Sequence, residues 1–322
     1  MTRSPTSDPV LQAGNALRGS GPTLNKPRPS GRGVEGWAKR LLVFALISLA
    51  IALPVLADAK GTLFIIGGGD RPESMMRRYA QLVRAAGSGK VIVLPNAGAE
   101  PQTSGPEMAA ELRGLGLEAE PLLLTRAEAD RPESLKILEG ASGVYFTGGI
   151  QSRVTAALQG TAFHRGLLEL YAGGAVVGGT SAGAAIMSEV MITGDEMRKV
   201  EEGHEFETIE PGNVVTVPGL GFIKEAVIDQ HFATRKRHNR LISVIAEHPG
   251  LLGIGIDEST AAVVHAGGLL EVVGEKNVIV IDAGRARVRL EPSGGIGIDD
   301  LVLHVLRPGD LFDLKTRKAA AR

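Results

Sequence analysis

The chain of 322 residues contains no cysteine. A disulfide bond, a thiolate nucleophile and a cysteine-ligated metal are therefore excluded, and covalent catalysis would have to use serine, threonine or another oxygen or nitrogen nucleophile. The sequence also has no excess of charge, since 35 Lys and Arg against 36 Asp and Glu leave a net charge of −1. Nucleic-acid-binding proteins usually carry a basic surplus, so this balance argues against nucleic acid as a partner.

Motifs for metal ions and dinucleotides are lacking as well. The seven histidines are scattered, and none forms a His-Glu-x-x-His motif. The glycine-rich stretch Gly67-Gly68-Gly69-Asp70 lacks the complete dinucleotide fingerprint and its later acidic residue. We therefore expect neither a metal ion nor another cofactor.

The apolar run 41–56 is short for a membrane-spanning helix and contains Pro54. Lys39-Arg40 precedes this run and Ala57-Asp58-Ala59 follows it, which is the pattern of a secretory signal peptide; a single membrane anchor is the alternative. We predict a disordered leader over 1–33 and a signal peptide over 34–59. The mature protein would then be periplasmic or secreted, with no stable membrane span after processing.

The rest of the chain alternates short apolar runs with amphipathic stretches, which is typical of an α/β fold with a parallel sheet covered on both faces. We expect helices near 74–86, 106–115 and 151–170. After residue 260, we expect the three apolar runs 261–264, 269–273 and 278–281 to form antiparallel strands added to the sheet edge. A single domain over 60–314 would be followed by a frayed basic tail, 315–322.

The best candidate nucleophile is Ser181. It lies in the segment Gly179-Thr180-Ser181-Ala182-Gly183, which fits Gly-x-Ser-x-Gly and follows the apolar run 175–177. A phosphate-binding loop is the alternative, but it would need a lysine or a longer spacing. We assign the oxyanion hole to the backbone N–H groups of Ala182 and Gly149.

His231 is the candidate general base, because it follows the apolar strand 226–228 and would lie where that strand leaves the core. A histidine satisfied by local hydrogen bonds is the alternative. The apolar run 253–256 ends in two carboxylates, Asp257 and Glu258, and either of them could orient His231. Arg235, Arg237 and Arg240 follow on a predicted helix and suggest recognition of carboxylates, against the alternative of a solvated basic face.

Three segments resemble the cyanophycinase family of serine peptidases: GGTSAGAAIM at 178–187, DQHFATRKRHNRL at 229–241 and GIGIDESTA at 253–261. The resemblance implies a three-layer sandwich of the class I glutamine-amidotransferase type with added C-terminal β-strands. It also implies a Ser181–His231–Glu258 triad, a homodimer, and exo-type cleavage of cyanophycin (multi-L-arginyl-poly-L-aspartate) to β-Asp-Arg dipeptides through an acyl-enzyme. The residues that it assigns to substrate binding are Gln151, Asp229, Gln230, Arg235, Arg237 and Arg240.

Two turns depart from the family pattern. Ile150-Gln151 stands where the family usually has Asp-Gln, and Gly69-Asp70-Arg71 replaces an acidic Ala-Glu-Asp segment. The alternatives are therefore an exported isoaspartyl or aspartyl dipeptidase-like hydrolase acting on other acidic peptides, or a catalytically silent binding protein on the same fold.

Overall fold

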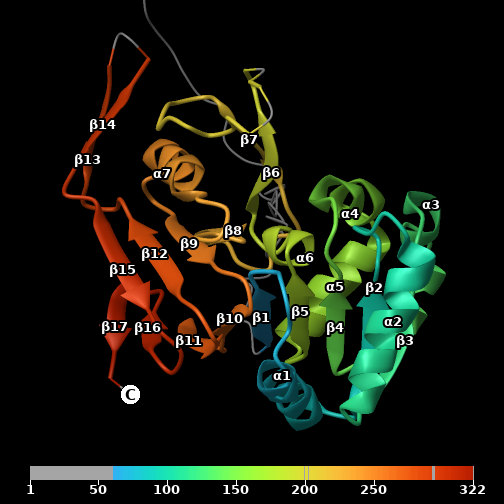
Figure 1. The fold of residues 1–322 in the computed structure, drawn as a ribbon. Helices are drawn as coiled ribbons and strands as arrows, with labels where there is room; N and C mark the ends of the chain where they lie inside the picture. Colours follow the sequence, from blue (N-terminus) through green and yellow to red (C-terminus); the bar gives the residue numbers. More distant parts are fainter. Residues whose placement is uncertain (1–60, 199, 202, 292–293, 322) are drawn as a thin grey trace, which may run out of the picture. The chain divides into compact units, whose positions relative to one another are not determined.

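A nine-stranded sheet runs through the part of the chain that the structure describes (Figure 1). The computed structural model describes residues 61–198, 200–201, 203–291 and 294–321. The predicted leader 1–33 and signal peptide 34–59 lie outside these residues. Within them, no helix combines the length and the apolar character needed to cross a bilayer.

Five parallel strands form one half of this sheet, in the order β1-β5-β4-β2-β3. Their side chains alternate between two buried faces, so that Leu63 and Ile65 pack on one side while Phe64 and Ile66 pack on the other. This two-sided burial explains why the strands read as continuous apolar runs. The strands are β1 (Thr62–Ile66), β2 (Lys90–Leu94), β3 (Glu118–Pro121), β4 (Gly143–Phe146) and β5 (Val176–Thr180).

Helices cover both faces of the parallel strands, as the predicted three-layer sandwich requires. Helices α1 (Glu73–Ala86) and α2 (Pro101–Gly114) pack on one face around the buried Tyr79. The other face carries α3 (Arg126–Ala129), the 3₁₀ helix η1 (Pro132–Leu138), α4 (Gln151–Leu158), α5 (Ala162–Ala172) and α6 (Ala182–Ala185). The single helix expected over 151–170 is therefore wrong: Gly160, at φ +74°, separates α4 from α5.

Antiparallel strands extend the sheet beyond β1, which confirms the expectation for two of the three apolar runs after residue 260. These two are β10 (Thr260–Val264) and β11 (Leu269–Gly274), joined by β16 (Leu311–Asp313) and β17 (Lys318–Ala320). The third run, β12 (Val278–Asp282), instead belongs to a second sheet. The expectation of one continuous edge is therefore wrong for β12.

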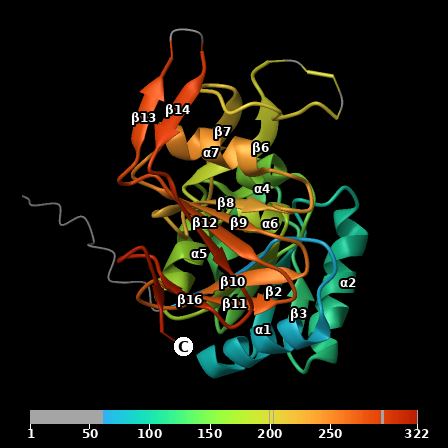
Figure 2. The ribbon, with the colours of Figure 1, turned by 60° about the vertical axis from the view of Figure 1, so that its left-hand side comes forward.

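The second sheet has the order β15-β12-β9-β8. Its strands β8 (Ala226–Gln230) and β9 (Leu252–Ile256) are parallel, whereas β12 and β15 (Val302–Leu306) run antiparallel to their neighbours. Helix α7 (His238–Glu247) packs against this sheet. Figure 2 shows two hairpins beside α7: β6 (Val190–Glu196) with β7 (Val214–Pro218), and β13 (Arg287–Leu290) with β14 (Ile296–Asp299).

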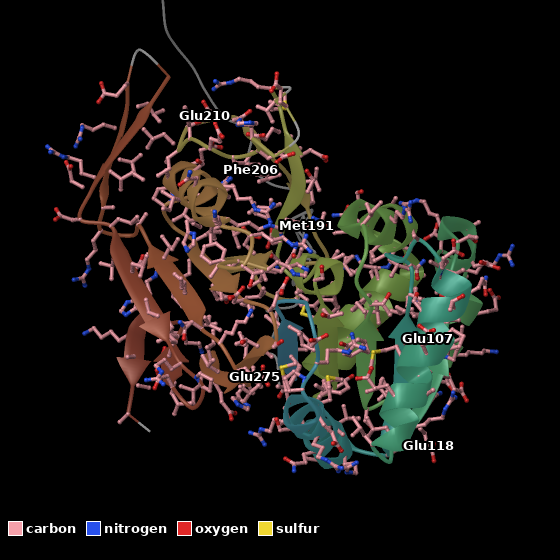
Figure 3. All side chains as sticks on the ribbon, viewed as in Figure 1. Glu107, Glu118, Met191, Phe206, Glu210 and Glu275 are labelled. Atoms are coloured by element: carbon pink, nitrogen blue, oxygen red, sulfur yellow. The ribbon has the colours of Figure 1, made fainter. Side chains whose placement is uncertain are left out.

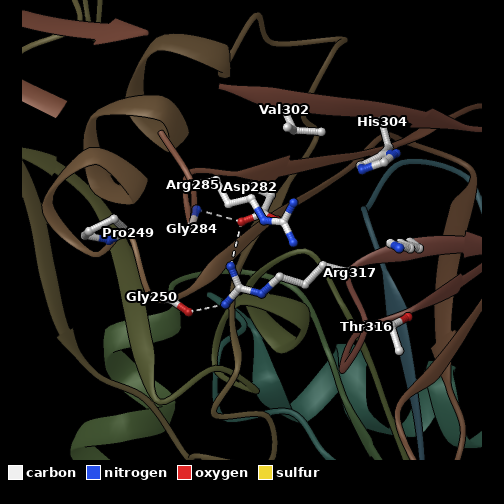
Figure 4. Close-up of a pocket in the computed structure, with 10 residues that line it drawn as sticks. Pro249, Gly250, Asp282, Gly284, Arg285, Val302, His304, Thr316 and Arg317 are labelled. Carbon is white, nitrogen blue, oxygen red and sulfur yellow. Dashed lines mark hydrogen bonds and ion pairs between the residues drawn. The ribbon is translucent and has the colours of Figure 1, made fainter. Parts of the chain in front are cut away.

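The C-terminal segment is held in the fold, so the prediction of a frayed tail over 315–322 is wrong for the part that the structure describes. Besides the pairing of β17 with β16, the guanidinium of Arg317 donates to the carboxylate of Asp282 on β12 at 2.6 Å and to the carbonyl of Gly250 (Figure 4). These contacts line a cavity of about 490 Å³ between the C-terminal segment and β12. The folded region therefore continues past the predicted boundary at residue 314.

Candidate active site

The turn between β5 and α6 presents Ser181. Its backbone is left-handed, with φ +53°, and it is followed at once by the helical Ala182. The tightness of the turn explains the flanking glycines. A Cβ at Gly179 would lie 2.4 Å from the carbonyl oxygen of Gly183, and a Cβ at Gly183 would lie 2.4 Å from that of Phe146. The Gly-x-Ser-x-Gly spacing is thus a steric requirement of this strand-to-helix turn.

Ser181, His231 and Glu258 form a hydrogen-bonded chain. The Ser181 Oγ lies 2.9 Å from Nε2 of His231, and Nδ1 of the same ring lies 2.6 Å from Oε1 of Glu258. Strands β8 and β9 are parallel and pair Gln230 with Ile256, so the residues that follow them leave the second sheet side by side. The predicted juxtaposition of the histidine with an acidic strand end is therefore present, although both come from the second sheet.

The sequence alone does not decide whether Asp257 or Glu258 orients His231, and in the structure the two carboxylates have different partners. Asp257 accepts a hydrogen bond from the backbone N–H of Thr234 at 2.9 Å and lies 3.7 Å from the ammonium group of Lys276. Although burial opposes its ionisation, the Thr234 hydrogen bonds lower the pKa of Asp257. Asp257 therefore holds the turn after β8, while Glu258 contacts the imidazole.

The glycine turn after β1 positions all three groups, which the sequence analysis did not foresee. The carbonyl of Ile66 accepts from the N–H of Ser181 at 3.0 Å, that of Gly67 from His231 at 2.6 Å and that of Gly68 from Ser259 at 2.9 Å. A Cβ at Gly68 would lie 2.3 Å from the His231 ring, and one at Gly69 would lie 2.8 Å from Cβ of Glu258. The sequence contains one signal for this role: three consecutive glycines follow an apolar strand without the other residues of a nucleotide fingerprint.

The imidazole of His231 is 8% exposed, and its burial lowers its pKa. The hydrogen bond to Glu258 opposes this effect, while the nearby guanidinium groups of Arg235 and Arg237 lower the pKa further. The ring is therefore neutral at pH 7, which is the state that can accept a proton from Ser181.

Two backbone N–H groups have free hydrogen-bonding capacity near the nucleophile. Among the described residues, neither the Ala182 N–H nor the Gly149 N–H donates to a protein acceptor. Gly149 lies near Ser181, because a Cβ built on the preceding residue, Gly148, would lie 3.4 Å from Cβ of Ser181. Donors placed in this way could bind the oxyanion of an acyl-transfer intermediate.

The predicted substrate residues fall into three groups. Asp229 and Arg240 are 1% and 2% exposed and form a two-point ion pair, in which Nε of Arg240 donates to Oδ2 of Asp229 at 2.8 Å and Nη2 donates to Oδ1. The guanidinium of Arg240 also lies over the ring of Phe206, 5.2 Å from its centroid; Phe206 is labelled in Figure 3. These two side chains bind one another, and the pair is closed off from solvent.

Gln230 and Arg237 form the second group. The Nη1 of Arg237 donates to both the carbonyl and the Oε1 of Gln230 at 2.8 Å, and burial lowers the pKa of Arg237 to about 10. Gln151 is buried and donates to the carbonyls of Ile192 and Thr193. Each of these side chains is thus engaged within the protein.

Arg235 is the third case, because its side chain is exposed. The helix expected to carry Arg235 to Arg240 begins only at His238, so the prediction is wrong for Arg235 and Arg237, which lie in turns. Ile150, where the sequence departs from the family pattern, is 48% exposed. No group of His, Asp or Glu among the described residues is arranged to hold a metal ion.

A serine on a strand-to-helix turn, hydrogen-bonded in sequence to a histidine and a carboxylate, is the arrangement of a serine-type hydrolase. The model of Peptidase family S51 matches residues 63–272. The cyanophycinase of Synechococcus elongatus is 34% identical over 270 residues, which cover 80% of this chain and 81% of that protein. The cyanophycinase of Trichormus variabilis is 35% identical over 268 residues, covering 80% and 87%.

The chain therefore belongs to peptidase family S51, the cyanophycinase family of serine-type peptidases. A solved peptidase from an acI-B1 actinobacterium superposes with a TM-score of 0.57 at 22% identity, covering 80% of this chain and 98% of that one. This likeness confirms the predicted fold class.

The buried ion pair predicts that Arg240 acts on stability. Arg240→Ala would leave the buried Asp229 carboxylate without its two-point ion-pair partner, and we expect the free energy of unfolding to fall by about 3–5 kcal/mol. The matched control is the exposed Arg235→Ala, which should change it by less than about 0.5 kcal/mol. Urea denaturation followed by circular dichroism measures both. An Arg240→Ala variant of unchanged stability and raised KM would instead place Arg240 in substrate binding.

The lowered pKa of His231 predicts the acid side of the pH profile. Proton acceptance needs the neutral ring, so kcat/KM should be constant near neutral pH and should fall only below pH 6.5, the usual value for histidine. Because the charge of Arg235 lowers this pKa, Arg235→Ala should move the midpoint to higher pH. Rates measured from pH 4.5 to 8.5 test both points. A wild-type midpoint above pH 7 would contradict the assignment.

Proposed function

We propose that the protein is an exported cyanophycinase, which hydrolyses cyanophycin from a chain end to β-Asp-Arg dipeptides. The hydrogen-bonded chain Ser181–His231–Glu258 is the observation on which this rests. The substrate is inferred from the relatives named cyanophycinase, which match about four fifths of the chain. Export rests on the signal-peptide pattern at 34–59, and N-terminal sequencing of the secreted protein would test it.

The proposed reaction uses the hydrogen-bonded chain in two halves. The Oγ of Ser181 attacks the backbone carbonyl of the polymer while Nε2 of His231 takes its proton. The oxyanion of the tetrahedral intermediate accepts hydrogen bonds from Ala182 and Gly149. The leaving amine then takes the proton from His231, which leaves an acyl-enzyme on Ser181. A water molecule, deprotonated by His231, hydrolyses this ester and restores Ser181. Glu258 stabilises the imidazolium in both halves.

The basic residues near His231 suit an acidic backbone. Arg235 is exposed, and it lies close enough to His231 to lower the pKa of the imidazole. A guanidinium there can bind the terminal carboxylate of a polyaspartate chain, which would favour cleavage from the chain end. Homodimerisation is proposed on the family resemblance alone.

A second candidate is a peptidase for other β-aspartyl or acidic peptides. The observation in its favour is Ile150, half exposed where the family usually has aspartate. An aliphatic side chain at this point cannot bind a substrate cation. Comparing digestion of the polymer with that of β-aspartyl dipeptides separates the two functions: the proposal requires the polymer to be digested.

The proposed nucleophile predicts that Ser181→Ala reduces kcat for cyanophycin by about 10⁴-fold or more. Release of β-Asp-Arg, identified by mass spectrometry, measures the loss, and circular dichroism checks that the fold is retained. Ser152→Ala is the matched control, since Ser152 is an exposed serine on α4 and should leave activity unchanged. Release of the dipeptide by Ser181→Ala at the wild-type rate would rule out Ser181 as the nucleophile.

A further inference from the structure

A pocket of about 220 Å³ opens next to the nucleophile, between α2 and the ends of β4 and β5. Thr180, which precedes Ser181, lines it together with Thr147 and Gly148. Gly148 lies close to Ser181, because a Cβ built on it would lie 3.4 Å from Cβ of the serine. A group attached near a scissile carbonyl at Ser181 could therefore enter this pocket.

The wall formed by α2 gives the pocket a surplus of negative charge. Arg71 is neutralised by Glu111, to which its Nε and Nη2 donate at 3.2 and 2.6 Å, and this hydrogen bonding raises the pKa of Arg71. Glu107 also lines the pocket and is exposed, and its carboxylate forms no hydrogen bond or ion pair with the other described residues. The uncompensated charge of the pocket is therefore that of Glu107.

Neutral oxygen acceptors accompany this carboxylate. Thr147 is 6% exposed, and its Oγ1 has no hydrogen-bond partner within the described residues. The Oγ of Ser104, on the α2 side of the pocket, also has no such partner. A guanidinium has five N–H donors and no acceptor, so it can use a carboxylate and hydroxyl oxygens together. A carboxylate ligand would instead meet Glu107 as a like charge.

The Asp229 carboxylate, which the family resemblance assigns to substrate binding, is already occupied within the protein. A carboxylate is the strongest protein partner for the guanidinium of an arginine branch, but Asp229 is buried and bound to Arg240 at two points. Its oxygens are not available to a substrate. Glu107 supplies an accessible carboxylate in a pocket that adjoins Ser181.

We propose that this pocket is the subsite for an arginine side chain next to the scissile bond, and that Glu107 determines the preference for its positive charge. This inference rests on the proposed function, since it assumes cleavage at Ser181 of a peptide with arginine branches.

The test compares two synthetic oligomers of the β-Asp-Arg repeat, one natural and one with citrulline, a neutral isostere, in place of arginine. For the wild type, kcat/KM should be higher for the arginine oligomer. Glu107→Gln should lower it by about threefold to tenfold for arginine, because a charge-assisted hydrogen bond is lost, and by less than about twofold for citrulline. Glu118→Gln is the control: Glu118 is an exposed carboxylate at the start of β3, at the end of the parallel strands opposite the pocket, and should change neither rate (Figure 3).

The possible outcomes distinguish a failure of the subsite assignment from a failure of the proposed function. If the wild type cleaves neither oligomer, the proposed function fails and the subsite with it. If both are cleaved but Glu107→Gln leaves the ratio of their rates unchanged, only the subsite assignment is overturned. Calorimetric binding of both oligomers to Ser181→Ala, with and without Glu107→Gln, checks the same ratio without turnover.

Discussion

The turn Gly67-Gly68-Gly69 after β1 is the constraint on which the site depends. Carbonyls of Ile66, Gly67 and Gly68 bind the N–H groups of Ser181, His231 and Ser259, which come from three different segments. Side chains at 68 and 69 would collide with the imidazole and with Glu258. One short segment without side chains thus fixes the position of a nucleophile from the first sheet against a base and an acid from the second.

The Asp229–Arg240 pair extends this constraint to the histidine loop. Asp229 lies on β8 two residues before His231, and Arg240 lies on α7, so the pair ties the strand to the helix across the turn that carries the base. His231 itself has a left-handed backbone, with φ +48°. Strain of this kind persists only where the surroundings over-determine the conformation. Polar residues that read as substrate ligands in the sequence can therefore serve to hold the base.

Local signals made Ser181 predictable, because glycine spacing and the preceding apolar strand act within a few residues. The pairing of His231 with an acidic strand end was also within reach, since both segments show where an apolar run stops. The features that the sequence could not predict are tertiary contacts. Strands β8 and β9 belong to a separate sheet. Asp257 binds Thr234 while Glu258 contacts the imidazole, and Arg240 is buried against Asp229. Each depends on which polar groups meet across distant segments, and sequence spacing does not encode that.

The charges around Ser181 bear on how the proposed substrate, which carries both carboxylates and guanidinium groups, would be recognised. Charges farther from the nucleophile than a Debye length are screened by salt, so the groups near Ser181 dominate this recognition. Arg235 and Arg237 lie near His231, while Glu107 faces the pocket beside Thr180. A ligand that carries carboxylates and guanidinium groups on one chain meets both signs there. Under the proposed subsite, a purely acidic peptide would place a like charge against Glu107, whereas a polymer with charges of both signs would not.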